Sequence, residues 1–273
     1  MLNFVVALVA ESQPLIRHFG LKEDIDARGF RVYRDNDIRL VISGIGKTAA
    51  SAGTAYLAAV ASAGHNDAWL NVGIAGHAAL SIGEGVHALR ITDAATGRNW
   101  CPPQILKLPG RGLSMLTVDQ AETDYAGDVA YDMEAAAFYS TALRFSVGEM
   151  TQCYKIISDN RADPANKMTR QRIGELVESH LPAIEEAAGA LNRLSADLAD
   201  TLPQLNDFDH FVDRWHFTVS QEHQLRSLMQ QWAARARDQP LWNEGLNRCP
   251  SAKSVLAELR QLLRKLPVNL DES

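Results

Sequence analysis

The stretch Ala130-Tyr-Asp-Met-Glu134, followed by three alanines, places a carboxylate where an apolar run passes into an alanine-rich helix. A second apolar run, Cys153–Asp159, ends in another acid, and Glu11 closes the first apolar run of the chain. Because buried strands of one sheet end along a common edge, we expect Glu11, Glu134 and Asp159 to converge there. Three converging carboxylates suit acid/base chemistry on a small polar substrate.

Each of these acids also has a purely structural interpretation. Glu134 could be a first-turn acid that favours the helix dipole, and Asp159 could cap a helix or close a turn. Glu11 could be an exposed acid after a strand. Their joint placement favours the functional interpretation.

Outward from this stretch, apolar runs alternate with helical segments. Strands are predicted over 2–10, 31–34, 39–43, 68–72, 83–92, 114–118 and 154–158, and helices over 12–19, 47–63, 133–145 and 168–195. Residues 99–112, rich in proline and glycine, are predicted to form a loop. The alternation predicts an α/β fold with a central, mostly parallel or mixed sheet flanked by helices.

After about residue 200 the strand signals stop, and apolar residues recur at helical spacing. One such series runs from Trp215 to Trp232, and another contains Leu256, Leu259, Leu262 and Leu263. The sequence therefore predicts a domain over 1–200 and a helical C-terminal extension over 201–273. We expect the extension to pack on the core or on a partner subunit.

The composition narrows the class of protein. The chain has 273 residues, a net charge of −6 and no lysine or arginine block, which argues against nucleic acid as a partner. Its first residues lack a basic segment, and no apolar stretch is long enough for a membrane span. Three scattered cysteines with no C-x-x-C pair predict a reduced, cytoplasmic protein without a metal cluster.

Two glycine turns follow predicted strands. Gly44-Ile-Gly-Lys-Thr48 approaches a P-loop, but Val41 stands where that motif needs its first glycine, and the match to a dinucleotide fingerprint is weak. The alternative without a ligand is a tight strand-to-helix turn that needs glycine backbone dihedrals. We favour a turn whose backbone N–H groups bind a polar ligand group, which makes Gly44 a candidate binding residue. The loop Gly73–Gly76 allows either close helix packing or a flat floor for a base or sugar.

Five segments together resemble motifs of the nucleoside phosphorylase/nucleosidase superfamily, most closely those of its methylthioadenosine/S-adenosylhomocysteine nucleosidase branch. They occur in family order within residues 1–195: Ala7–Glu11, Ser43–Lys47, Asn71–Gly76, Asp132–Ala135 and Ile157–Asp159. The resemblance implies the three-layer fold of that superfamily, no cofactor, and a homodimer. It also implies hydrolysis of the N-ribosidic bond of a purine nucleoside with a modified 5′ position.

The resemblance assigns a role to each matching residue. Glu11 would activate the attacking water, and Asp159 would donate a proton to purine N7 with support from Ser158. Met133 and Glu134 would hold the ribose. The backbone groups of Ala75 and Gly76 would line the base and sugar pocket.

The chain departs from the family pattern at several positions. Ile74 replaces a serine, Lys155 stands where an arginine commonly precedes the last motif, and Thr117–Ala121 lacks a base-stacking aromatic. The phosphate-binding motifs of the phosphorylase branch are absent, which favours water as the acceptor. Two alternatives stay open: a phosphorolytic purine nucleoside phosphorylase, and an inactive nucleoside-binding protein whose tail docks a partner.

Overall fold

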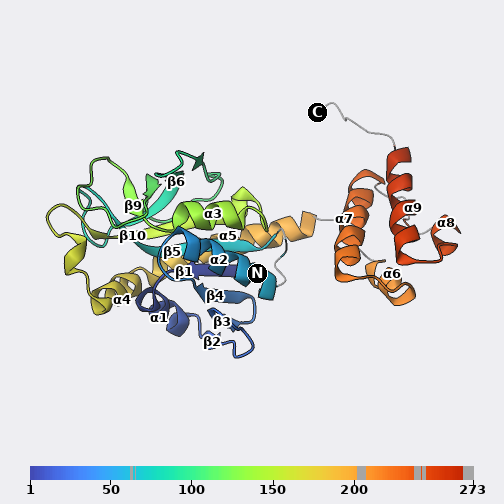
Figure 1. The fold of residues 1–273 in the computed structure, drawn as a ribbon, viewed down its shortest axis with the longest axis horizontal. Coiled ribbons are helices and arrows are strands. Elements are labelled where there is room, and N and C mark those ends of the chain that lie inside the picture. Colours follow the sequence, from blue (N-terminus) through green and yellow to red (C-terminus); the bar gives the residue numbers. More distant parts are fainter. Residues whose placement is uncertain (62–63, 65, 202–206, 237–240, 242–243, 267–273) are drawn as a thin grey trace. The chain divides into compact units, whose positions relative to one another are not determined.

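The computed structural model describes residues 1–61, 64, 66–201, 207–236, 241 and 244–266. It divides into two compact units, Met1–Asp197 and Leu198–Ser273, and each is described by itself (Figure 1). The first unit contains a mixed sheet between helices. The described part of the second unit is helical. Whether the two units fold as separate domains stays a prediction.

The strands of the first unit form one sheet in which parallel and antiparallel pairs are mixed. They are β1 (Leu2–Val6), β2 (Lys22–Glu23), β3 (Arg31–Asp35), β4 (Ile38–Ile42), β5 (Ala68–Gly76), β6 (Gly85–Asp93), β7 (Asn99–Trp100), β8 (Arg111–Thr117), β9 (Ala130–Asp132) and β10 (Thr151–Asp159). Half of the sheet is open, in the order β5-β1-β4-β3-β2. The other half closes on itself, because β5 pairs with β10, β10 with β6, β6 with β8, β8 with β9, and β9 again with β5.

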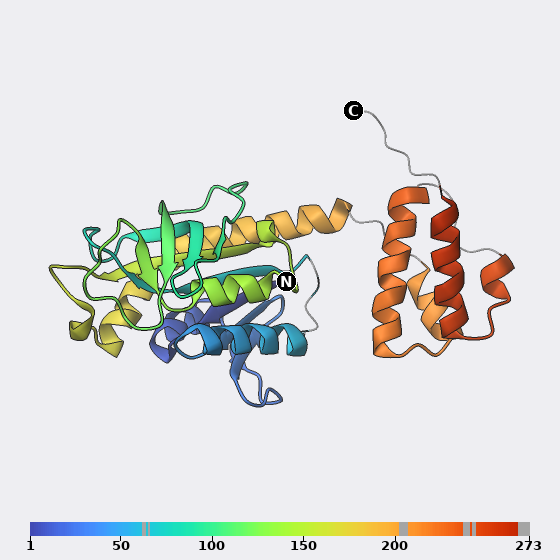
Figure 2. The ribbon, with the colours of Figure 1, turned by 45° about the horizontal axis from the view of Figure 1, so that its top comes forward.

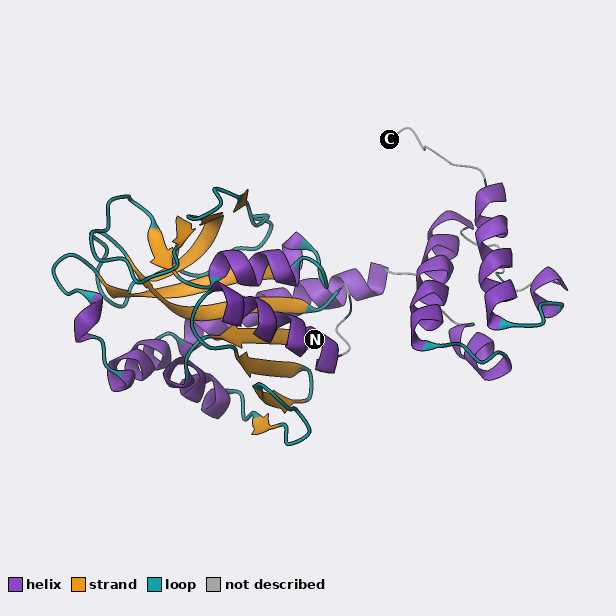
Figure 3. Ribbon diagram, viewed as in Figure 1, coloured by secondary structure: helices purple, strands orange, loops and turns teal. Residues whose placement is uncertain are grey.

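Helices cover both faces of this sheet (Figures 1 and 3). They are α1 (Val9–His18), α2 (Lys47–Ala61), α3 (Ala135–Ala142), α4 (Arg170–Ser179) and α5 (Leu181–Thr201), with short 3-10 turns at Gly148–Met150 and Ala165–Lys167. Helices α2 and α3 pack side by side on one face, and α1 packs against α4 on the other (Figure 2). The α/β fold with a central sheet flanked by helices is confirmed.

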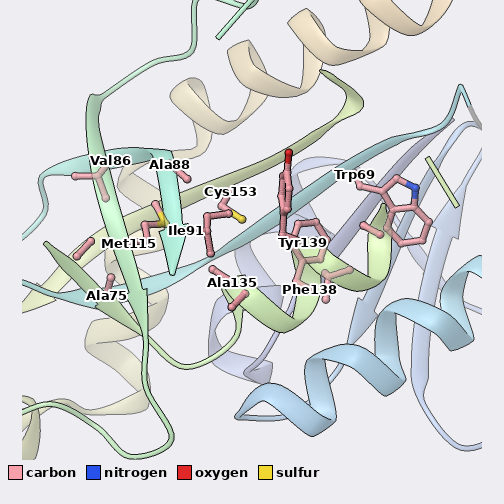
Figure 4. Close-up of a cluster of buried hydrophobic side chains, with 14 of the residues drawn as sticks. Trp69, Ala75, Val86, Ala88, Ile91, Met115, Ala135, Phe138, Tyr139 and Cys153 are labelled. Carbon is pink, nitrogen blue, oxygen red and sulfur yellow. The ribbon is translucent and has the colours of Figure 1, made fainter. Parts of the chain in front are cut away.

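Two buried apolar layers hold the helices to the sheet. Trp69 of β5, Leu57 of α2 and Phe138 of α3 belong to one layer, part of which Figure 4 shows. The neighbouring β5 residue, Leu70, belongs to the other layer, with Leu15 of α1. Because successive side chains of a strand point to opposite faces, β5 supplies both layers, which explains its nearly continuous apolar sequence.

Several predicted boundaries are wrong. The first strand ends at Val6 and a helix begins at Val9, so Glu11 lies in the first turn of α1. Residues 130–132 form strand β9, and the helix after them begins only at Ala135. The predicted loop 99–112 contains β7 and the start of β8, and the helical region 168–195 is two helices. The errors share a cause, since an apolar run does not show where a strand gives way to a helix.

The second unit has its own apolar core. Its helices are α6 (Phe208–Arg214), α7 (Val219–Ala236), α8 (Glu244–Asn247) and α9 (Ala252–Lys265). The predicted leucine series lies in α9, which packs against α7. Trp215 and Phe217, in contrast, precede α7, and the Trp215 indole donates to the carbonyl oxygen of Cys249 at 2.9 Å. Within the described residues of the chain, no helix is long and apolar enough to cross a membrane.

Candidate active site

One cavity of about 210 Å³ gathers seven of the eight predicted site residues. The seven that line it are Glu11, Ala75, Gly76, Met133, Glu134, Ser158 and Asp159. They come from α1 and from the ends of β5, β9 and β10, so the predicted convergence of strand ends places them together. Gly44 does not line this cavity, although its neighbour Ile45 does.

Glu11 is held in the cavity wall by backbone donors. Its Oε2 accepts hydrogen bonds from the N–H groups of Ala7 at 3.1 Å and Leu8 at 2.8 Å, and its Oε1 accepts one from Ile74 at 3.1 Å. Glu11 is only 2% exposed. Burial raises its pKa to about 7, the nearby carboxylate of Glu134 adds to the rise, and Lys155 and the backbone donors oppose it. A carboxyl group with this pKa can accept a proton near neutral pH.

Glycine is required at two places in the β5 wall. A Cβ atom at Gly73 would lie 2.8 Å from the Glu11 Oε1 atom. A Cβ atom at Gly76 would lie 2.5 Å from the Asp159 Oδ2 atom and 2.7 Å from the Tyr125 ring. The small residues of Gly73–Gly76 therefore leave room for two carboxylates as well as for a ligand.

The turn at Gly44–Gly46 positions Glu134. Both glycines have positive φ angles, +90° and +93°, which other residues rarely adopt. The Gly46 N–H donates to the Glu134 Oε1 atom at 2.8 Å. This amide therefore serves a carboxylate of the protein, and the expected contact between Gly44 and a ligand group stays a prediction. Burial, together with Asp132, raises the pKa of Glu134 against the opposing effects of Lys155 and the Gly46 amide.

A buried cation stands behind these acids. The Lys155 Nζ atom lies 3.1 Å from Asp132 Oδ2 and 3.7 Å from Glu134 Oε2, and Lys155 is 1% exposed. Burial lowers the pKa of Lys155, but Asp132, Glu134 and Glu11 raise it by more, so the ammonium group stays charged. Asp132 is further held by the Thr117 hydroxyl at 2.7 Å. The resemblance drew attention to Lys155 as a departure, whereas no sequence signal gave a role to Asp132.

Two hydroxyl groups contact Asp159. The Tyr125 phenol donates to its Oδ2 atom, and the Ser158 hydroxyl donates to its Oδ1 atom. Burial and the bond to Asp159 raise the pKa of Tyr125, so the phenol keeps its proton. Tyr125 is completely buried. No sequence motif pointed to Tyr125, because it lies in a loop far from Asp159 along the chain.

The loop between β8 and β9 forms another side of the cavity. Val118, Ala121 and Glu122 from this loop line it, as does Tyr131 of β9. The Tyr131 hydroxyl accepts a hydrogen bond from the Gly127 N–H at 2.7 Å, which fixes the loop to β9. The sequence shows no aromatic over residues 117–121, and Tyr131 of the neighbouring strand is the aromatic residue among the described lining.

The charges of the cavity have one sign. Five acidic residues are among those that line it: Glu11, Glu122, Asp132, Glu134 and Asp159. Among the described residues that line it there is no lysine or arginine. This wall can accept hydrogen bonds and stabilise developing positive charge. In the described residues, no group of three or more His, Cys, Asp or Glu side chains is arranged to hold a metal ion.

Comparisons with solved structures identify the fold. The chain is similar to a 5′-methylthioadenosine/S-adenosylhomocysteine nucleosidase of Streptococcus pneumoniae (TM-score 0.57, 21% identity, covering 70% of this chain and 99% of that one), solved with a transition-state inhibitor. It is also similar to the corresponding nucleosidase of Colwellia psychrerythraea bound to adenine (TM-score 0.55, 18% identity, 71% and 95% covered). A futalosine hydrolase of Helicobacter pylori matches with a TM-score of 0.50, 16% identity, and 72% and 97% coverage.

No family model and no curated protein sequence matches the chain. The chain shares the fold of these nucleosidases and of the futalosine hydrolase, which confirms the fold that the resemblance of the five sequence motifs implies.

Proposed function

We propose that the protein hydrolyses the N-ribosidic bond of a purine nucleoside with a modified 5′ position, releasing the free base and a ribose derivative. The observation that carries this proposal is the presence, in one cavity, of a buried Glu11 with a pKa of about 7 and an Asp159 contacted by two hydroxyl groups. Two carboxyl groups in different environments can divide the work of base and acid.

Cleavage of the N-ribosidic bond builds positive charge on the sugar, as in glycoside hydrolysis. Glu11 accepts a proton from the attacking water. Asp159 first takes up a proton from solvent and passes it to N7 of the departing base, and the Tyr125 and Ser158 hydroxyls stabilise the carboxylate that remains. Glu134 and Met133 hold the ribose, and Ala75 and Gly76 form the floor of the pocket for the base and sugar. The Lys155 ammonium group offsets the negative charge of Asp132 and Glu134.

Water is favoured over phosphate as the acceptor by the charge of the cavity. A phosphate dianion would have to enter beside the acidic side chains of the lining, with no lysine or arginine in the described lining to receive it. The deeply buried Lys155 already contacts Asp132 and Glu134. A cytoplasmic homodimer without a cofactor completes the proposal.

The test is chromatography of free base released from methylthioadenosine, S-adenosylhomocysteine, adenosine and inosine, with and without phosphate. We expect release without phosphate, and a loss of roughly 100-fold or more in Glu11→Gln and in Asp159→Asn. Release only with phosphate would indicate a phosphorylase. Ligand binding without release by the folded protein would indicate a binding protein.

A further inference from the structure

Tyr125, in the loop between β8 and β9, has an unusual backbone conformation. Its φ angle is +46°, a value that a residue with a bulky side chain rarely adopts. Among the described residues other than glycine, only Asn36 shares a positive φ angle, and asparagine tolerates that conformation in turns. Because the conformation is unfavourable for tyrosine, the contacts around Tyr125 must hold it there.

The Tyr125 side chain makes one set of these contacts. It is completely buried, and its phenol donates to the Asp159 Oδ2 atom. The ring lies against Gly76, where a Cβ atom would approach it to 2.7 Å. Tyr125 is not among the described residues that line the cavity. Its influence on a ligand in the cavity therefore passes through the Asp159 carboxyl group.

Arg161 makes a second set of contacts, with the backbone. Its Nη2 atom donates to the Tyr125 carbonyl oxygen at 2.8 Å, and its Nε atom donates to the Asp124 carbonyl oxygen at 3.4 Å. These two carbonyl groups belong to the peptide units on either side of the Tyr125 Cα atom. Because a guanidinium group presents its N–H donors in a rigid planar fork, one side chain can fix both peptide units, and with them the φ and ψ angles of Tyr125.

The turn that carries Arg161 is itself held in place. Arg161 lies two residues after Asp159, and the Asn160 side chain between them accepts hydrogen bonds from two backbone N–H groups of the turn, at 2.9 Å and 3.0 Å. The Asn160 amide also donates to the Leu80 carbonyl oxygen at 2.8 Å. The end of β10 therefore holds Tyr125 twice, with the Asp159 carboxylate at the phenol and the Arg161 guanidinium group at the backbone.

We propose that Arg161 is a positioning residue for the reaction. It holds the Tyr125 backbone in the left-handed conformation, and this conformation places the phenol on the carboxyl group that passes a proton to the base. Arg161 thus acts on Asp159 through Tyr125. This inference deepens the proposed function and rests on it. Its consequence is that the effect of Arg161 on turnover depends on the Tyr125 hydroxyl group.

The test is a double-mutant cycle of Arg161→Gln and Tyr125→Phe, with kcat measured on the nucleoside from which wild type releases most base. We expect Arg161→Gln to lower kcat by about five- to tenfold in the wild-type background. In the Tyr125→Phe background, which keeps the ring and the backbone but lacks the hydroxyl, it should change kcat by less than about twofold. The control Arg144→Gln removes the same charge from an exposed side chain after α3 and should leave kcat unchanged in both backgrounds.

Two kinetic results would overturn the inference. An unchanged kcat in Arg161→Gln would show that Arg161 does not act on the reaction. An equal loss in both backgrounds would show that it acts through charge or general stability, because neither of these needs the Tyr125 hydroxyl.

Hydrogen exchange in the full chain tests the hold of Arg161 on the loop without turnover. The Gly127 N–H donates to the Tyr131 hydroxyl at 2.7 Å, so its exchange reports the position of the loop close to Tyr125. Residues 119–129 should exchange about tenfold faster in Arg161→Gln than in wild type, with the β5 amides unchanged. If no nucleoside is cleaved, this result supports the hold of Arg161 on Tyr125, and only the hydrolase proposal fails. Equal exchange of the loop in variant and wild type would contradict the inference whatever the turnover.

Discussion

Replacing Glu11 with glutamine should make the protein's stability less dependent on pH while removing turnover. In the folded chain the pKa of Glu11 is about 7, against 4.5 for an ordinary glutamate. Below pH 4.5 the Glu11 carboxyl group is protonated in both the folded and the unfolded chain, so its ionisation does not lower the free energy of unfolding. As the pH rises from 4.5 to 7 the unfolded chain ionises first, and the folded state loses stability.

The size of this effect follows from the two pKa values. At roughly 1.4 kcal/mol per pKa unit, the full difference corresponds to about 3 kcal/mol, of which about 2 to 3 kcal/mol falls between pH 5 and pH 8. Glutamine also disturbs the hydrogen bonds from Ala7, Leu8 and Ile74, because one of its two polar atoms is a donor. That cost does not vary with pH, so the change between the two pH values isolates the ionisation of residue 11.

Hydrogen exchange of the β1 and β5 amides, followed at pH 5 and pH 8 after correction for intrinsic rates, measures stability in the first unit alone. Relative to wild type, Glu11→Gln should gain about 2 to 3 kcal/mol on going from pH 5 to pH 8. The control is Glu23→Gln at an exposed glutamate of β2, which should show no such gain. In parallel, wild-type kcat/KM should fall below about pH 7 as Glu11 takes up its proton. An equal pH dependence in Glu11→Gln and wild type would refute the argument that burial controls this group.

Three further substitutions test the supporting groups. Lys155→Met leaves Asp132 and Glu134 without their buried cation. Denaturant unfolding at pH 8 should show that the free energy of unfolding falls by about 3 to 5 kcal/mol. The fall should be smaller at pH 5, because burial raises the pKa of Glu134 and a proton can replace the lost cation there. Tyr125→Phe removes one donor from Asp159 and should lower kcat about tenfold with little change in unfolding; an unchanged kcat would exclude Tyr125 from the reaction. Gly73→Ala forces the Glu11 carboxylate to move and should lower kcat by roughly 10- to 100-fold; full activity would show that its position is not critical.

Short motifs predicted the fold and most of the residues that line the cavity, because each motif depends only on residues that are close together in the sequence. Seven of the eight candidate residues line one cavity. Six of them stand at or beside the end of a strand, and strand ends meet in space, whereas Glu11 lies in the first turn of α1. Gly44 was placed by the same rule, but its turn is occupied with holding Glu134 through the neighbouring Gly46 amide.

The contacts between distant segments could not be predicted. Tyr125 reaches Asp159 only because the loop between β8 and β9 folds back against β10, and nothing in a single sequence fixes the path of such a loop. The start of α1 could not be predicted from the sequence for another reason. Leu8 stands at the N-cap without a capping side chain, and the first free backbone donors go instead to Glu11 at the third helical position.

The closure of half the sheet has a consequence for synthesis of the chain. Strand β10 pairs with β5 on one side and with β6 on the other, so until residue 159 has been made these two earlier strands lack their shared neighbour. Nascent chains that end before β10 expose two apolar strand edges, which makes them targets for chaperones or for aggregation. The second unit is translated only afterwards. A ribosome that stalls within the second unit therefore releases a chain whose sheet has every strand, whereas one that stalls just before residue 151 releases a chain that cannot close the sheet.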